Sequence, residues 1–231
     1  MIKVLLFLIL AVLFGMLSSI CLAENSTVES AQKLGADQSL VLLKEGNLRF
    51  MKGSSVYPNQ TSHQRKVLAL QGQNPFATIV SASDSRVDPV LIFDRGLGDI
   101  FTVRLAGNVV GSDTLASVEY SMLALETPLL VVMGHTRSTL IQAAVEGVKM
   151  NGHLMQLLGK LEPAIKMTKV LYPSLKGTEL INKVAEINVR QVMRDILGHC
   201  PAILGKVRSG KARIMGAIYD TDTGAVRWLG P

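Results

Sequence analysis

Apolar residues follow three different patterns along this chain. Residues 4–22 form one long, predominantly apolar stretch, and residues 29–52 place leucines and Phe50 at helical spacing, with breaks at Gly46 and Gly53. A second helical piece is predicted at 62–71. Short β-branched runs, which predict buried strands, then follow at 77–81, 100–104 and 129–133.

The intervals between these runs are long enough for helices that connect parallel strands. Amphipathic spacing predicts the helices at 112–126, 138–150, 151–172 with a break at Pro163, and 178–197. Two further strands are predicted at 212–219 and 225–229, joined by the Asp222-Thr223-Gly224 turn. We therefore expect an α/β fold, with a mostly parallel central sheet flanked by helices.

No linker or internal repeat divides the chain after its apolar start. We expect one domain over 24–231, made of a helical arm at 24–71 and an α/β core at 77–231.

The first apolar run has the layout of a secretory signal peptide over residues 1–23. Lys3 supplies a basic start, Val4 to Phe14 an apolar stretch, and Cys21-Leu22-Ala23 a cleavage context. We expect an exported, periplasmic protein. The alternative is an uncleaved N-terminal membrane anchor, because about twenty apolar residues span a bilayer.

The net charge, aromatic content and cysteine count limit which partners and which kinds of metal site are possible. The formal net charge is +6, but the chain has no lysine or arginine run and only 5% aromatic residues, which argues against nucleic acid as a partner. Of the two cysteines, only Cys200 remains after removal of residues 1–23. An intrachain disulfide and a site of the CxxC type are both excluded in the processed chain.

Polar residues gather just after three of the predicted strands. The segments are Ser81 to Val87, Val103 to Asn108, and Gly134 to Ser138. Open α/β sheets bind ligands at the carboxyl ends of their strands, so we expect these segments to meet at one site.

From about residue 39 to its end, the chain resembles the β-class carbonic anhydrases. The matching segments occur in the family's order and spacing. They are LKEGNLRF (43–50), QNPF (73–76), DSRV (84–87), IFDRGLGDIF (92–101), Arg104 with AGN (106–108), SVEY (117–120), GH (134–135) and YD (219–220).

The resemblance implies a zinc site built from a C-x-D-S-R segment and an H-x-x-C segment. In this chain Ala82 and Ser138 stand in place of the two cysteines, and only His135 remains of the three ligands. Zinc is the family's cofactor, but alanine offers no donor and a neutral serine hydroxyl is a poor one. His135 and Asp84 are left as a weak, residual metal pair, and we expect no metal at high occupancy.

The resemblance also assigns roles to the other residues of the site. Asp84 and Arg86 match the family's aspartate–arginine dyad and are our candidate catalytic residues. Gln73, Arg86 and Gly107 are the candidate contacts for substrate or another small anion. The family further implies a homodimer or tetramer.

Three functions fit this sequence. The first is a carbonic anhydrase family protein handling CO2 or bicarbonate, with hydration that is weak, metal-independent or lost. The second is non-catalytic binding of bicarbonate or another small oxyanion, as a carrier, sensor or regulatory subunit. The third is a vestigial site in a protein that serves through assembly.

Overall fold

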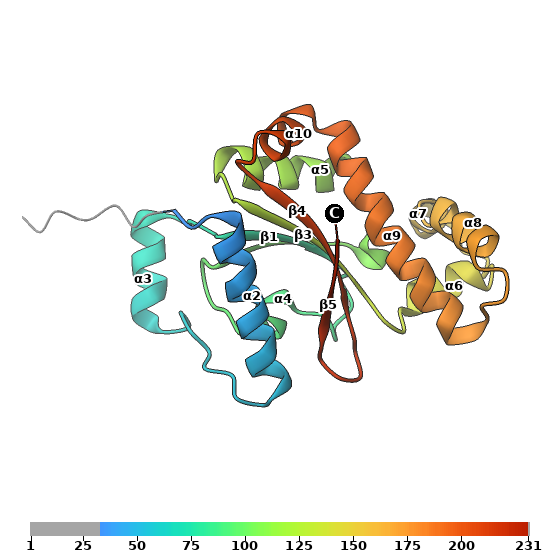
Figure 1. Cartoon of the computed structure of the whole chain (residues 1–231), viewed down its shortest axis with the longest axis horizontal. Coiled ribbons are helices and arrows are strands. Elements are labelled where there is room, and N and C mark those ends of the chain that lie inside the picture. The colour runs from blue at the N-terminus through green and yellow to red at the C-terminus, as the bar shows by residue number, and fades with distance from the viewer. Residues whose placement is uncertain (1–32, 231) are drawn as a thin grey trace, which may run out of the picture. The chain divides into compact units, whose positions relative to one another are not determined.

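The computed structural model describes residues 33–230, and its first helix begins at Ala36. The predicted signal peptide, and the predicted domain boundary at residue 24, lie outside the described residues. A single five-stranded sheet has the strand order β2-β1-β3-β4-β5 (Figure 1). Its strands are β1 (Ala77–Ser81), β2 (Ile100–Arg104), β3 (Leu129–His135), β4 (Arg213–Tyr219) and β5 (Val226–Leu229).

Four strands run parallel and only β5 is antiparallel, which confirms the predicted mostly parallel sheet. The central strands β1 and β3 are buried along their whole length, so their sequences read as continuous apolar runs. Alternate residues of one strand face opposite layers. Val80 and Val132 belong to one apolar cluster, and Ile79 and Val131 to the other.

One face of the sheet is covered by α2 (Ala36–Met51) and α4 (Pro89–Ile92) (Figure 1). Leu40 and Leu43 of α2 are buried in the apolar cluster on this face, so α2 is a core helix rather than part of an arm. The helix also runs through Gly46, where a break was predicted. Only α3 (Ser62–Gln71), which buries none of its residues, fits the predicted arm.

The opposite face is covered by a long helix, α9 (Gly177–His199), together with α10 (Pro201–Arg208) and α5 (Ser112–Glu119). After α5 the chain makes a π-helical turn over Tyr120–Ala124. Ten residues of α9 are buried, and they recur at helical spacing along its length. This face therefore holds the larger part of the core.

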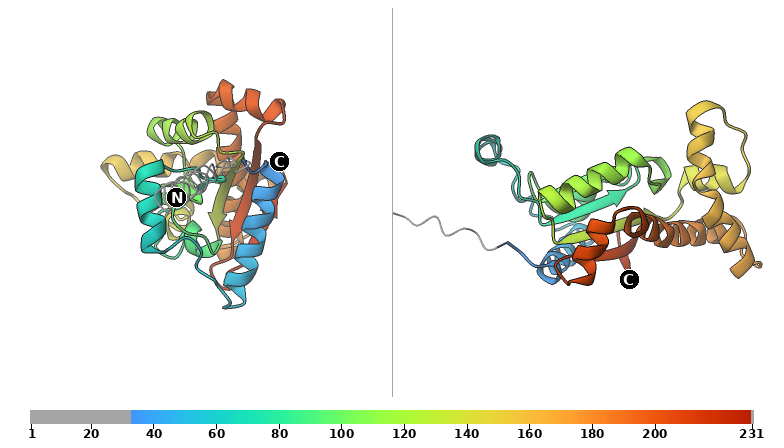
Figure 2. Two further views of the ribbon diagram at one scale, coloured as in Figure 1. Left: turned by 90° about the vertical axis from the view of Figure 1, so that its left-hand side faces the viewer. Right: turned by 90° about the horizontal axis from the view of Figure 1, so that it is seen from above.

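Three shorter helices form a lobe beside α9 (Figures 1 and 2). They are α6 (Thr139–Val145), α7 (Gly152–Gly159) and α8 (Glu162–Leu171). The break predicted at Pro163 falls earlier, at residues 160–161, because proline fits the first turn of a helix and Pro163 lies in the first turn of α8. Within residues 33–230, no helix is both long and apolar enough to cross a membrane.

Candidate functional site

A pocket of about 250 Å³ lies at the carboxyl ends of the parallel strands. All three polar segments singled out in the sequence contribute to it. Its lining residues are Ala82, Ser83 and Asp84 after β1, Ala106 and Gly107 after β2, and His135, Ser138, Thr139 and Leu140 around the end of β3. The sheet topology thus brings together residues more than fifty positions apart.

Asp84 and Arg86 form a two-pronged ion pair at this pocket. Arg86 donates from Nε to Oδ1 of Asp84 at 2.9 Å and from Nη2 to Oδ2 at 2.7 Å, and the Arg86 amide also donates to Oδ1. The hydrogen bonds from Arg86 hold the pKa of Asp84 well below its ordinary value. Asp84 is therefore an ionised carboxylate with little capacity to act as a base.

Arg104, at the end of the neighbouring strand β2, holds the loop that carries this pair. Its guanidinium donates from Nε to the carbonyl oxygen of Ala82 at 3.2 Å and from Nη2 to that of Asp84 at 3.0 Å. Since both acceptors are main-chain atoms, Arg104 fixes the backbone around Asp84 and leaves its carboxylate to Arg86. Arg104 is a positioning residue.

His135 is 3% exposed and is the only histidine among the lining residues of this pocket. Its Nδ1 lies 2.9 Å from the carbonyl oxygen of Thr136, which can only accept, so Nδ1 carries the proton. Burial lowers the pKa of His135, so the ring is neutral at pH 7 and Nε2 keeps a free lone pair. The 3.9 Å approach of Nε2 to Oδ2 of Asp84 is then not an ion pair.

The two positions matching the family's cysteines also lie in the pocket wall. Ala82 is 2% exposed. Ser138 is the capping residue just before α6, and its hydroxyl accepts a hydrogen bond from the amide of Ile141 at 3.5 Å. Gly107 adopts φ +71, and a Cβ there would lie 2.6 Å from Cδ2 of Leu140. Glycine at 107 thus leaves room for the residues around it.

Gln73 does not reach this pocket within one chain. It is exposed in the segment before β1, at the opposite end of that strand from Ala82. Within a single chain the structure therefore does not support the predicted contact between Gln73 and substrate, because β1 separates the two by its full length.

Two hydrogen bonds of the site were not predicted from the sequence. The carbonyl oxygen of Arg137 accepts from Nη2 of Arg86 at 3.3 Å, and the amide of Arg137 donates to Oδ1 of Asn182 in α9 at 2.9 Å. Arg137 has φ +54, a conformation that few non-glycine residues adopt. The long separation in sequence between Arg86, Arg137 and Asn182 hid these contacts.

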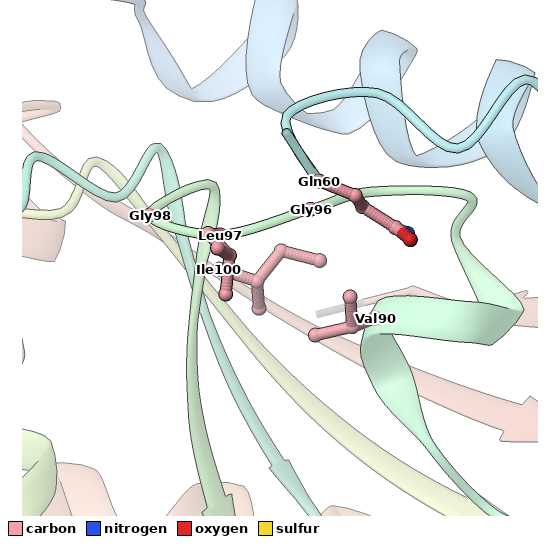
Figure 3. A pocket seen from close by; sticks show the side chains of 6 residues that line it. All are labelled: Gln60, Val90, Gly96, Leu97, Gly98 and Ile100. Atoms are coloured by element: carbon pink, nitrogen blue, oxygen red, sulfur yellow. The ribbon is translucent and has the colours of Figure 1, made fainter. Parts of the chain in front are cut away.

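A second hollow, of about 390 Å³, lies near the start of β2 and is lined by Gln60, Val90, Gly96, Leu97, Gly98 and Ile100 (Figure 3). None of these side chains titrates near neutral pH or is a usual metal ligand. The chemistry of the molecule is therefore assigned to the pocket at the carboxyl ends of the strands.

Comparison with known proteins decides the family. A family model described as carbonic anhydrase matches residues 77–226, which include every lining residue of the pocket. This chain belongs to the β-class carbonic anhydrase family. It is 34% identical to carbonic anhydrase 2 of Mycobacterium tuberculosis over 186 residues, which cover 79% of this chain and 87% of that protein. It is 31% identical to a carbonic anhydrase of Mycolicibacterium smegmatis, covering 80% and 88%.

Solved structures of β-carbonic anhydrases share the fold. The β-carbonic anhydrase CcaA superposes with a TM-score of 0.66 at 26% identity, over 84% of this chain and 99% of that chain. A tetrameric β-carbonic anhydrase of Sordaria macrospora gives a TM-score of 0.67 at 23% identity, over 74% and 89%. The predicted fold is therefore confirmed.

The carbonic anhydrase family is zinc-dependent, but the side chains that line this pocket do not provide the ligands of a zinc ion. Catalytic zinc takes three protein ligands of nitrogen, sulfur or oxygen. Here Ala82 has no donor atom, the Ser138 hydroxyl is a neutral helix cap, and Arg86 occupies both oxygens of Asp84. Residues 33–230 contain no group of three histidine, cysteine, aspartate or glutamate side chains placed to hold a metal.

The buried neutral ring of His135 predicts a specific acid sensitivity. The pKa of His135 in the folded chain lies below the unfolded value of 6.5. Between these two pKa values, the unfolded chain binds a proton at this residue and the folded chain does not. Stability should therefore fall as the pH drops below about 6.5, by up to about 1.4 kcal/mol per pH unit, until the folded pKa is passed. Asp84, whose pKa is lowered, contributes stability that is lost only at more acidic pH.

Urea unfolding of the His135→Gln variant between pH 7 and pH 5 checks this expectation. The variant should lose part of the pH slope, whereas His63→Gln, on the exposed surface of α3, serves as the matched control. Identical slopes for His135→Gln and the native protein would show that the ring is not buried in its neutral form.

Proposed function

We propose that this chain handles CO2 and bicarbonate in the pocket around Asp84 and His135, with CO2 hydration reduced to a slow, metal-independent rate. The family membership supports the substrate. The observation that carries the reduction in rate is the pair Ala82 and Ser138, which bring no thiolate to the pocket wall. Without a metal-bound hydroxide, water must be activated by a side chain.

His135 is the side chain best placed to do this. Its unprotonated Nε2 accepts a proton from water as the water oxygen bonds to the carbon of CO2, which yields bicarbonate and a protonated ring. The same burial that lowers the pKa of His135 makes it release this proton readily, but also makes it a weak base. Asp84, locked in its pair with Arg86, keeps a negative charge beside the ring and stabilises the protonated form.

This arrangement sets a ceiling on the rate. General-base assistance contributes about 10²–10⁴, whereas zinc lowers the pKa of water from about 15.7 to about 7 and supplies hydroxide directly. A pocket that relies on a weakly basic histidine therefore stays far below a zinc enzyme.

One observation supports a second candidate function, the non-catalytic binding of bicarbonate or a similar small oxyanion. The side chain of Arg86 is 46% exposed, so one edge of its planar cation remains open to solvent beside the pocket. If binding alone survives, bicarbonate raises the melting temperature of the native protein and not of Arg86→Gln, while neither protein turns over CO2.

The test of the leading proposal is stopped-flow CO2 hydration by purified protein of measured metal content. We expect less than a tenth of a zinc ion per chain, and a slow rate that chelator leaves unchanged and that His135→Gln abolishes. A tightly held zinc ion in each chain, or a fast rate that chelator removes, contradicts the proposal.

We further propose that the protein is exported and forms dimers or tetramers. The apolar run at 4–22 supports export. The named relative from Sordaria macrospora is tetrameric, and α3 leaves Leu70 88% exposed with no buried residue along the helix. Light scattering of the eluted protein distinguishes a monomer from these assemblies.

A further inference from the structure

The lobe formed by α6, α7 and α8 (Figure 1) carries an open groove of about 650 Å³. The groove shares no lining residue with the pocket at the strand ends, although α6 contributes residues to both. The groove is lined by Ala144, Gly147 to Asn151, Met155, Leu158, Gly159, Glu162, Ile165, Lys166 and Lys169.

The walls of this groove are unusually apolar for a surface. In α7, four of the eight residues are leucine or methionine, yet none of the eight is buried. Met155 is 58% exposed and Val148 is 42% exposed, and both line the groove. Exposed apolar surface gathered in a concave site is typical of a binding groove for an apolar group.

The charges around the groove are almost all positive. Lys149, Lys166 and Lys169 line it, and the single acid is Glu162, which is already paired with Lys166 at 2.6 Å. Among residues 33–230, Lys149 and Lys169 form no ion pair. An occupant therefore meets apolar walls and two unneutralised cations in the same groove.

We propose that this groove binds a single-chain anionic amphiphile, a molecule with one alkyl chain and a carboxylate or similar head. The chain lies against Met155, Leu158 and Ile165. The head faces Lys149 and Lys169, whose flexible ammonium groups suit a compact anion. A volume of about 650 Å³ lies within the range of small-molecule sites.

Fluorescence titration with 11-(dansylamino)undecanoic acid tests the proposal, with its methyl ester as the uncharged probe. We expect saturable binding of the acid and at least tenfold weaker binding of the ester. Met155→Glu should weaken binding of the acid at least tenfold. Met167→Glu, on α8 and 43% exposed but outside the groove lining, is the matched control and should bind normally.

The lysines are tested in the same way. Lys149→Gln/Lys169→Gln should weaken binding of the acid at least tenfold, whereas Lys176→Gln, which lies outside the groove, should not. Urea midpoints of all variants confirm that they fold. Equal binding of acid and ester, equal losses in the groove and control variants, or binding only to phosphatidylglycerol vesicles or to an acidic peptide overturns the proposal.

Discussion

The double variant Ala82→Cys/Ser138→Cys is expected to bind about one zinc ion per chain and to hydrate CO2 at least about a thousandfold faster than the native protein. The reason is geometric. Residues 82, 135 and 138 line one pocket, so two new thiolates join His135 and complete a set of three protein ligands. Metal analysis and stopped-flow hydration of the zinc-loaded protein measure both effects.

The single variants are the matched controls. Ala82→Cys alone and Ser138→Cys alone each supply one thiolate beside His135, and two protein ligands do not hold zinc tightly. Loss of the Ser138 cap costs about 1 kcal/mol of stability. Because zinc binds the folded double variant, adding zinc should restore stability to it. A double variant that folds and takes up zinc but stays inactive shows that other parts of the pocket have lost competence.

Gly46→Ala is expected to destabilise the protein by about 3 kcal/mol or more. A Cβ at this position would lie 1.8 Å from the carbonyl oxygen of Phe93 and 2.7 Å from its carbonyl carbon. Both are main-chain atoms at the end of α4, so no flexible side chain can move aside. Relief requires α2 to move away from the sheet, which would uncover Leu40 and Leu43.

Gly205→Ala is the control for this change. Gly205 lies in the exposed part of α10, and nothing approaches its Cβ position within 4 Å. Alanine favours helix over glycine by about 1 kcal/mol, so this variant should be slightly more stable than the native protein. Urea midpoints compare the two variants, and a loss below 1 kcal/mol in Gly46→Ala would show that α2 does not sit against Phe93.

The sheet could be predicted from sequence because its pattern is local. The strands at 77–81 and 100–104 match their predicted ranges, since both are short runs rich in β-branched residues. The break predicted at Gly46 was wrong. The low helix propensity of glycine predicts a break, but glycine stays within a helix where close packing leaves no room for a side chain. Here the approach of Phe93, 47 positions away, requires it, and no local pattern reports such a contact.

The candidate site shows the same division. The strand ends predicted which segments meet, and Asp84, His135 and Ser138 do line one pocket. The hydrogen bonds that Arg86, Arg104 and Asn182 make around the pocket could not be predicted, because each joins a side chain to a main-chain atom of a distant segment. The substrate contact of Gln73 was predicted from the family resemblance alone. A resemblance in sequence does not say whether a side chain contributes to the pocket of its own chain or to that of another subunit.

Arg104 holds residue 82 by a hydrogen bond to its carbonyl oxygen, so this contact does not depend on the side chain at that position. A carbonyl is common to all twenty amino acids, so the loop keeps its path whether residue 82 is alanine, cysteine or another small side chain. Selection can then exchange the chemistry of this position in one step without first repairing the scaffold. In a library covering all substitutions at 82, small residues should fold alike, and this position offers a natural place to install new donors.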